Sequence, residues 1–334
     1  MYGKIPGTLP SPEVRILEEG TLAIDDKAIR KQVQLAFKNG ADSICMNILI
    51  YTPNKKLKAP VFLGYNFAGN YLLHKDPFIL IDGKKEKELS GDSFEKFKTQ
   101  KRGERTSRWA IEKIIESGYG LVTLNYNDVD RDKNDFSDGI HSLLYKSDQI
   151  KPEDDQWGSI SAWAWGMSRV MDYLETETLI DEKKVILFGH SRLGKTSLWA
   201  GALDQRFSMV ISNNSGCGGA ALSRRRFGEK VSDITKNWSH WFAKNFQKYS
   251  ENESSLPIDQ HMLISLIAPR PVYVASASKD SWADPRGEFI SAKQASKVYK
   301  LYGMQGIELY DYPRVNTPIH QSIGYHLRDG EHDV

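Results

Sequence analysis

One stretch of the chain, LFGHSRLGKTS at residues 187–197, limits the possible folds more than any other. An apolar run at 185–188 leads into it and a helix-forming run at 196–203 follows it, so we expect a strand, a sharp turn and a helix. Two functional motifs share this layout. Residues 189–196 fit the phosphate loop G-x-x-x-x-G-K-[ST], while residues 189–191 fit the start of the nucleophile elbow G-x-S-x-G. The stretch alone predicts either nucleotide binding or ester hydrolysis in an α/β fold.

The composition excludes several classes of partner. The 334 residues carry 45 Lys and Arg against 43 Asp and Glu, a formal net charge of +2, so no overall field attracts nucleic acid or an anionic membrane. No apolar run approaches the roughly 20 residues of a membrane-spanning helix, and residues 1–4 do not resemble a signal peptide. Two cysteines, Cys45 and Cys217, are too few for a disulfide framework or a structural zinc site. We expect no metal, no cofactor and a small-molecule or neutral polymer ligand.

Strand and helix patterns alternate along the chain, which predicts a mostly parallel sheet. Polar and apolar residues alternate at 31–37, and a second strand pattern at 42–51 continues into a turn. These two segments are expected to form an antiparallel edge. Further strands are expected at 61–65, 120–125, 184–188, 209–212 and 271–275, and helices at 108–116 and 157–177. The crowded charges at 84–108 indicate a surface insertion. We predict one α/β domain over residues 1–334.

The surrounding sequence favours the elbow over the phosphate loop. A phosphate loop usually follows the first strand of its sheet and works with a second strand that ends in a magnesium-binding Asp. Here several strands precede the motif, and the strand at 209–212 runs into Asn213 and Asn214. The phosphate-loop hypothesis would require magnesium-dependent nucleotide binding. A third interpretation, in which Ser191 only caps the helix that follows it, stays open on local sequence.

A serine nucleophile needs a carboxylate and a base, in the chain order Ser, acid, His for an α/β-hydrolase. Asp280 follows an apolar strand into a polar loop, at the sheet edge where open α/β folds place their sites. His332 lies late in the chain in a turn-rich segment that suits a base carried on a loop. Asp284, which also suits a helix cap, competes with Asp280, and His326 competes with His332. We prefer Asp280 and His332.

The oxyanion donors are expected next to the nucleophile. The backbone amide of Arg192 lies at a helix N-terminus, where N–H groups lack partners within the helix. The second donor is expected after the first buried strand, at Asn66 or Phe67. The elbow departs from its formula, because Leu193 stands where the second glycine belongs and Gly194 comes one residue later.

Many further segments share one resemblance. They are HSRLGK at 190–195, NSGCGGAALSRRRFGE at 214–229, HWF at 240–242, LPIDQH at 256–261, APRP at 268–271 and WADPRGEF at 282–289, together with YGKIP at 2–6, NFAGN at 66–70 and SRW at 107–109. Together they resemble the bacterial glucuronoyl esterases of carbohydrate esterase family 15, over nearly the whole chain. The resemblance implies an α/β-hydrolase that cleaves the ester between 4-O-methyl-glucuronate of xylan and lignin alcohols, without metal or cofactor.

The resemblance also assigns roles to residues of this chain. Ser191 resembles the nucleophile of the family, His332 its base and Arg192 its oxyanion residue. Lys195 resembles the residue that contacts hydroxyls of the glucuronate, and Trp282 one that lines the sugar site. Lys195 lies one helical turn after the serine and so on the same face, although a structural salt bridge would also explain a lysine there.

Two other charged positions are expected near the same cleft. Glu229 and Arg225 are candidates for binding the sugar, although the run at 224–226 would also suit a solvated or salt-bridged surface. The family's catalytic acid in some members stands at the position of Asn214, and an asparagine cannot serve as a carboxylate. That departure leaves Asp280 as the expected acid.

The sequence ends at Val334, whereas members of the family usually continue into a final helix after the base. We therefore expect that helix to be absent and the loop of His332 to be poorly held. The resemblance implies a secreted or periplasmic protein, although no leader is visible, and we expect a monomer.

The predicted function is a serine carboxyl esterase acting on glucuronate esters, built as a three-layer α/β-hydrolase with an antiparallel N-terminal edge. An acetylxylan esterase would share the triad, but Lys195 and Trp282 suit a sugar on the acyl side of the ester. A catalytically silent carbohydrate-binding protein is the alternative from another class, because Asn214 replaces the acid of some relatives.

Overall fold

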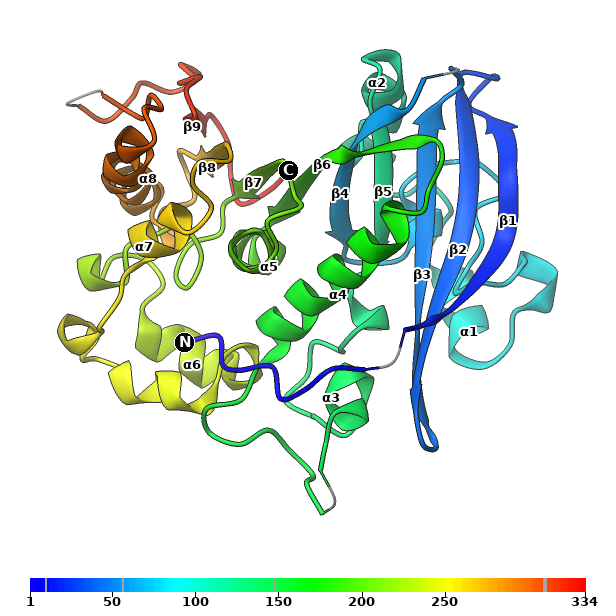
Figure 1. Cartoon of the computed structure of the whole chain (residues 1–334), viewed down its shortest axis with the longest axis horizontal. Coiled ribbons are helices and arrows are strands. Elements are labelled where there is room, and N and C mark those ends of the chain that lie inside the picture. The colour runs from blue at the N-terminus through cyan, green and yellow to red at the C-terminus, as the bar shows by residue number, and fades with distance from the viewer. Residues whose placement is uncertain (10, 56, 147, 309–310) are drawn as a thin grey trace.

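The computed structural model describes residues 1–9, 11–55, 57–146, 148–308 and 311–334 and arranges them around a nine-stranded sheet (Figure 1). The strands are β1 Glu13–Ala23, β2 Ala28–Asn39, β3 Asp42–Pro53, β4 Ala59–Asn66, β5 Gly120–Asn125, β6 Ile180–His190, β7 Met209–Asn213, β8 Val272–Ala277 and β9 Ile323–Arg328. Their order across the sheet is β1-β2-β3-β5-β4-β6-β7-β8-β9. The pairs from β1 to β5 are antiparallel and those from β5 to β9 are parallel, which confirms a mostly parallel sheet with an antiparallel N-terminal edge.

The connections between strands supply the helices. The α-helices are α1 Gly91–Thr99, α2 Ile111–Glu116, α3 Gly139–Leu143, α4 Ser159–Leu174, α5 Arg192–Leu203, α6 Val231–Asn237, α7 Gln260–Ser265 and α8 Pro285–Leu301. Short 3-10 helices occupy η1 Asn70–Leu72, η2 Glu86–Glu88, η3 Thr106–Arg108, η4 Tyr126–Asp128, η5 Ser223–Arg225, η6 Ser239–Trp241, η7 Lys244–Tyr249, η8 Glu253–Ser255 and η9 Ser281–Ala283.

Helices cover both faces of the sheet because successive side chains of a strand point to opposite sides. In β5, Val122 joins a core that contains the buried residues of α4 and α5, whereas Leu121 joins a second core with Ile111 and Ile115 of α2. α4 and α5 also pack on each other, and α8 packs on β8 and β9. The predicted three-layer arrangement is therefore confirmed.

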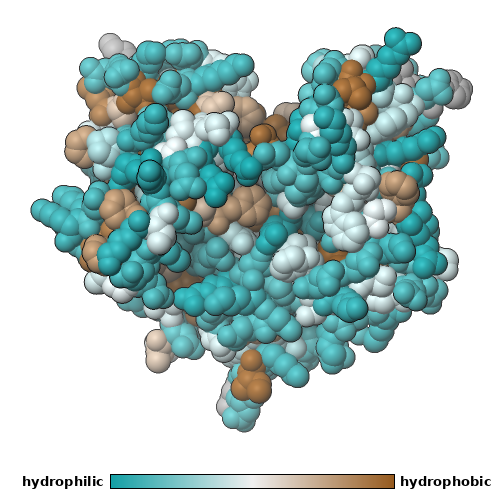
Figure 2. All heavy atoms as spheres, turned by 180° about the vertical axis from the view of Figure 1, so that it is seen from behind, coloured by the Kyte–Doolittle hydropathy of each residue, from teal (hydrophilic) through white to brown (hydrophobic). Residues whose placement is uncertain are grey.

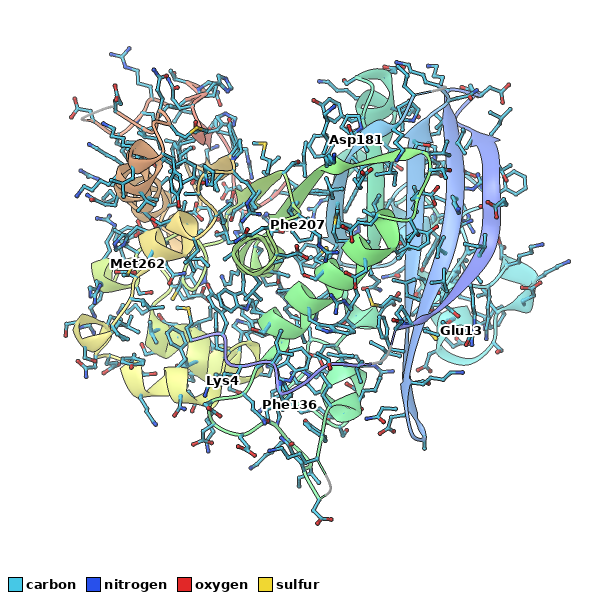
Figure 3. All side chains as sticks on the ribbon, viewed as in Figure 1. Lys4, Glu13, Phe136, Asp181, Phe207 and Met262 are labelled. Carbon is cyan, nitrogen blue, oxygen red and sulfur yellow. The ribbon has the colours of Figure 1, made fainter. Side chains whose placement is uncertain are left out.

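The molecular surface is mainly polar, with one marked hollow. From behind, the molecule is notched at its upper edge, and hydrophobic residues lie at the base of the notch (Figure 2). Large side chains fill the interior; Phe207, which is fully buried, lies in the middle of the molecule near α5 (Figure 3). In the part of the chain that the structure describes, no helix has the length and apolarity to cross a membrane.

Several predicted boundaries move in the structure. The helix expected from Arg108 begins at Ile111, because Trp109 has an extended backbone after η3. The helix expected at 157–177 is α4, Ser159–Leu174. β1 was not predicted; most of its side chains are partly or fully exposed, so its sequence lacks a clear apolar face and its partner β2 supplies the pairing. The prediction of one domain with an insertion at 84–108 stays a prediction.

Candidate active site

The turn after β6 has the geometry of a nucleophile elbow. β6 ends at His190 and α5 begins at Arg192, so Ser191 alone makes the turn, with φ 57° and ψ −127°. Such a backbone costs a non-glycine residue about 1–3 kcal/mol and is typical of functional sites. The turn also needs small neighbours, because a Cβ on Gly189 would lie 2.1 Å from the Leu193 carbonyl oxygen, and one on Gly194 would lie 3.0 Å from the Cβ of Ser215. The shifted second glycine therefore still serves the close packing of this turn.

The side chain of Ser191 does not cap the helix and faces a histidine instead. No cap hydrogen bond forms from Ser191 to α5. Its Oγ lies 3.0 Å from Nε2 of His332, and Nδ1 of His332 lies 2.6 Å from Oδ2 of Asp280. These side chains, from the turn after β6, the loop after β8 and the segment after β9, thus form a continuous hydrogen-bonded chain.

The Asp280 carboxylate is buried and held on both oxygens. Oδ1 accepts from the amide of Ala283 in η9, and Oδ2 accepts from Nδ2 of Asn214 at 2.6 Å as well as from His332. Burial alone would raise the pKa of this carboxyl, but the hydrogen bonds from His332 and Asn214 hold it below its usual value. Asn214 therefore donates to the carboxylate that faces the histidine.

Asp284 and His326, the alternative candidates for the acid and the base, make other contacts. Asp284 caps α8 by accepting from the amide of Gly287 and pairs with Nε of Arg225 at 2.8 Å. His326 lies within β9, where it pairs with Ala275. Neither Asp284 nor His326 takes part in the hydrogen-bonded chain to Ser191.

The segment that carries His332 is tied to the sheet by side chains. Asn213 donates to the carbonyl of Asp333 at 3.1 Å, and the Asp333 carboxylate pairs with Arg108 at 2.9 Å. Arg328 also donates to the carbonyl of Asp333. The expectation of a poorly held loop is therefore wrong for the described residues, because its backbone and its side chain both have partners.

His190 is a neutral neighbour of the base. Burial, and then the proximity of His332, lower the pKa of His190 to about 4. Its ring centroid lies 4.7 Å from that of His332, and its Nδ1 faces Nδ2 of Asn213 at 2.9 Å. Because the amide nitrogen can only donate, Nδ1 of His190 accepts and the proton lies on Nε2.

The side chains of the expected oxyanion residues, Arg192 and Asn66, both have partners in the structure. The guanidinium of Arg192 pairs with Asp132 and lies over the rings of Trp238 and Trp241, at 5.1 and 4.8 Å from their centroids. The side chain of Asn66 is committed within its own loop, since it donates to Asn70 and accepts from the amide of Gly69. These side-chain contacts leave the backbone amides near Arg192 and Asn66 as the predicted oxyanion donors, and that assignment stays a prediction.

Lys195 and Glu229 lie together beside the elbow. The Lys195 side chain is only 4% exposed; its Nζ donates to the Ser215 carbonyl at 2.6 Å and lies 3.8 Å from the Glu229 carboxylate. Burial raises the pKa of Glu229, and the nearby Lys195 opposes this rise. The Glu229 amide donates to the carbonyl of Trp282, whose residue is 52% exposed. The structure thus brings three expected sugar-site residues together, whereas Arg225 pairs with Asp284.

Comparison with known proteins identifies the family. Residues 106–303, more than half of the chain, match the model of the family described as "Glucuronyl esterase, fungi". The whole chain is 49% identical to carbohydrate esterase MZ0003, from an unknown prokaryotic organism, and covers 78% of that protein. The chain belongs to the glucuronoyl esterase family.

Relatives with known structures agree with this assignment. A glucuronoyl esterase from Solibacter usitatus superposes with a TM-score of 0.90 at 41% identity, over all of this chain and 85% of that one. A CE15 esterase from a marine bacterial metagenome gives a TM-score of 0.87 at 48% identity, over all of this chain and 84% of that one. By sequence alone, the chain is also similar to a 4-O-methyl-glucuronoyl methylesterase of Podospora anserina, at 32% identity over 61% of this chain and 44% of that protein.

Membership of the esterase family excludes the phosphate-loop hypothesis, and the structure gives the physical reason. The lysine of that motif, Lys195, donates to the Ser215 carbonyl and faces the Glu229 carboxylate, an acceptor that suits hydroxyl groups and would disfavour a nucleotide phosphate. Within the described ranges, no group of three or more His, Cys, Asp or Glu side chains is arranged to hold a metal ion.

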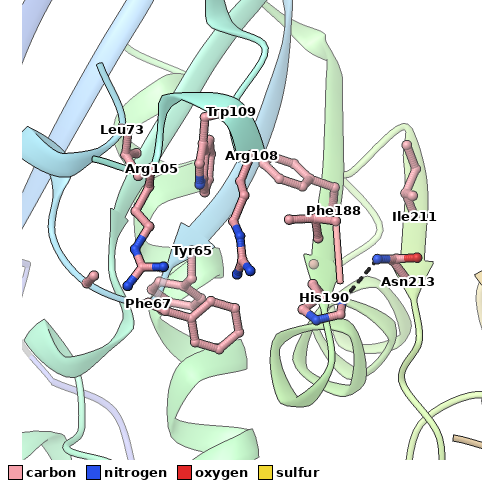
Figure 4. A pocket seen from close by; sticks show the side chains of 13 residues that line it. Tyr65, Phe67, Leu73, Arg105, Arg108, Trp109, Phe188, His190, Ile211 and Asn213 are labelled. Atoms are coloured by element: carbon pink, nitrogen blue, oxygen red, sulfur yellow. Dashed lines mark hydrogen bonds between the residues drawn. The ribbon is translucent and has the colours of Figure 1, made fainter. Parts of the chain in front are cut away.

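A pocket of about 510 Å³ lies beside His190, at the C-terminal ends of β4, β6 and β7 (Figure 4). Aromatic side chains of Tyr65, Phe67, Trp109 and Phe188 line much of it, and Arg105 and Arg108 point into it. The dashed contact in Figure 4 joins His190 to Asn213, so the pocket borders the residues that support His332.

Sequence reasoning missed three polar residues that hold the site. Asp132 binds Arg192, Asn213 binds the segment of His332, and Glu288 binds the loop after β7. The only signal for Asn213 was its place at the end of a strand beside the elbow. Asp132 lies in an acidic run, DVDRDKND, in which nothing distinguishes it from its neighbours.

Proposed function

We propose that this protein is a serine esterase that hydrolyses esters of glucuronic acid. The observation that carries the proposal is the chain of contacts from Ser191 Oγ through His332 to Asp280, with buried Lys195 and Glu229 beside it. Relatives named 4-O-methyl-glucuronoyl methylesterase support the choice of acyl group.

In the acylation step, His332 Nε2 takes the proton of Ser191 while Oγ attacks the ester carbonyl of the uronate. The carbonyl π electrons move to oxygen, and the negative charge is held by the backbone amide and the guanidinium of Arg192 and by a backbone N–H near Phe67. As the intermediate collapses, the C–O bond to the alcohol breaks and His332 returns the proton to the departing alkoxide.

In the deacylation step, His332 takes a proton from water, and the resulting hydroxide attacks the glucuronyl-serine ester. The bond to Ser191 Oγ breaks, Oγ recovers the proton from His332, and glucuronic acid leaves. Asp280 keeps the imidazole in the tautomer with the proton on Nδ1 and stabilises its cationic form. The depressed pKa of the Asp280 carboxyl keeps that support ionised.

We assign the sugar to the side of the elbow occupied by Lys195. Lys195 and Glu229 offer a donor and acceptors to the sugar hydroxyls, and the exposed indole of Trp282 offers an apolar face to the ring. A 4-O-methyl-glucuronate carried by xylan is the proposed natural acyl group. We further propose action outside the cytoplasm, as a single-domain monomer.

The first experiment compares benzyl glucuronate with 4-nitrophenyl acetate. We expect strong cleavage of the uronate ester, and a loss of at least about 10³-fold in kcat on Ser191→Ala, because no other group supplies the nucleophile. Ser197→Ala is the matched control, since Ser197 lies in the same helix and its hydroxyl donates to the Leu193 carbonyl. It should keep kcat.

Other outcomes would point to the alternatives. Cleavage of acetate alone would move the protein to the acetyl esterases. Binding of xylo-oligosaccharide without hydrolysis would favour a silent binding protein, and unchanged hydrolysis by a folded Ser191→Ala variant would disprove the nucleophile.

A further inference from the structure

Asp132 is a carboxylate next to the active site whose side chain is 9% exposed, and the proposed reaction assigns it no role. It lies in the loop after η4, and four side chains donate to it. Oδ1 accepts from Nε2 of His240 at 2.8 Å and from Nε1 of Trp241 at 2.7 Å. Oδ2 accepts from the hydroxyl of Tyr126 at 3.2 Å and from the guanidinium of Arg192.

The charge of this carboxylate is secured by its donors. Burial by itself would raise the pKa of Asp132, but the hydrogen bonds from His240 and Trp241 and the charge of Arg192 bring it to about 2. Asp132 is therefore ionised at any pH at which an ester would be assayed. A buried anion of this kind is stabilised by a cation, and Arg192 is the cation in direct contact with it.

Arg192 is held on more than one side. Nη1 is bound by Asp132, and the planar guanidinium lies over Trp238 and Trp241, whose rings stack at 4.7 Å with an 8° angle between planes. Its Nε is buried and has no hydrogen-bond partner among the described residues. The position of the side chain is thus fixed, one residue after Ser191.

We propose that Asp132 is the positioning residue of the Arg192 guanidinium and acts on the reaction only through it. An oxyanion donor contributes most when its place is fixed before the charge develops, because no reorganisation is then needed in the transition state. Asp132 fixes the guanidinium in advance by binding its Nη1, and the indoles of Trp238 and Trp241 fix the orientation of its plane. The proposal rests on the oxyanion role given to Arg192 in the proposed function.

The test is a double-mutant cycle with Asp132→Asn and Arg192→Ala, in which kcat and KM are measured on benzyl glucuronate and 4-nitrophenyl acetate. We expect Asp132→Asn to lower kcat for both esters by roughly 10–100-fold with KM changed by less than about threefold, since both reactions pass through an oxyanion. Added to Arg192→Ala, it should cost little more, because the residue through which it acts is gone. Wild-type kcat in Asp132→Asn, or losses that multiply in the double variant, would overturn the inference.

The same cycle separates this inference from the proposed function. Wild-type kcat in Arg192→Ala would remove the oxyanion role itself, whereas a loss in Arg192→Ala without one in Asp132→Asn would remove only the role of Asp132. Tyr126→Phe is the matched control, because it deletes another donor to the same carboxylate and leaves Arg192 in place; it should keep kcat, and an equal loss in this variant would show a general packing role instead.

A variant that fails to fold does not end the test. Asp132→Glu keeps the charge but moves the carboxylate by one methylene, and its cycle with Arg192→Ala is expected to be non-additive in the same way. A folded Asp132→Glu enzyme with normal kcat and only a lower melting temperature would overturn the proposal, since a purely structural residue would give that result.

Discussion

Asp280 and Asp284 are close in sequence, but the structure gives their carboxylates different partners. Asp280 accepts from His332 and Asn214, whereas Asp284 accepts from the amide of Gly287 and pairs with Arg225. A carboxylate that fixes the histidine tautomer affects turnover, and one that caps a helix affects stability. The two aspartates should therefore be separable by experiment.

We expect Asp280→Asn to lower kcat by about 10³–10⁴-fold, because an amide stabilises the wrong tautomer of His332. Asp284→Asn keeps an oxygen for the amide of Gly287 and tolerates the left-handed backbone, but it loses the ion pair with Arg225. It should lower the free energy of unfolding by about 1–3 kcal/mol and leave kcat within a few-fold. The two variants should be measured side by side by ester hydrolysis and urea unfolding; an exchange of these two results would make Asp284 the acid.

At the scale of elements, the strand β6, the turn at Ser191 and the helix α5 must approach one another closely. A side chain at Gly189 would place its Cβ against the backbone carbonyl of Leu193, which cannot move without shifting the first turn of α5. We expect Gly189→Ala to lower the free energy of unfolding by more than about 3 kcal/mol or to prevent folding. Circular dichroism during urea unfolding would measure the change.

Gly7→Ala, in the segment before β1, is a suitable control for Gly189→Ala. The added Cβ would meet only the side chain of Leu144 at 3.6 Å, which is an ordinary contact. Its stability should stay near that of the wild type. A Gly189→Ala protein of wild-type stability would mean that the elbow can relax, and the close packing would then not explain the glycine.

At the scale of the whole molecule, one buried carboxyl should make stability depend on pH. Burial raises the pKa of Glu288 to about 7, against hydrogen bonds from Ser276 and the amide of Gly216 that favour its ionised form. In the unfolded chain the pKa of this carboxyl returns to its usual value of 4.5. Between those values the folded state holds more protons than the unfolded state, so the stability of the wild type should fall as the pH rises from about 4.5 to 7.

The side chain introduced by Glu288→Gln cannot titrate, so this variant should lack the loss of stability between pH 4.5 and 7. Its amide oxygen can still accept from Gly216, and its nitrogen can donate to Ser276. The free energy of unfolding of the variant, relative to the wild type, should rise by up to about 3 kcal/mol between pH 4.5 and 7. Urea unfolding at several pH values would measure this difference. Parallel curves for the two proteins would show that Glu288 does not titrate in this window.

The sequence by itself determined the local parts of the protein. The apolar run before Ser191, the glycines beside it and the helix-forming run after it predicted the elbow, because each depends on neighbours a few residues away. Alternating strands and helices predicted the parallel sheet, and the buried strands β4 to β8 were found because both faces must be apolar, although the buried strand β9 was not predicted. The edge strand β1 was missed, since an exposed strand takes its conformation from its partner and leaves little hydrophobic pattern.

Only the tertiary structure decided which polar groups meet. The preference for Asp280 over Asp284 rested on proximity to a strand end, whereas their different partners come from loops distant in the chain. Asp132 and Glu288 carried no local signal, because a buried carboxylate is marked by the donors that surround it, and those donors come from other elements. Secondary structure depends largely on residues that are close in the sequence. Side-chain hydrogen bonds and pKa values depend on burial and on long-range packing, which a linear sequence does not display.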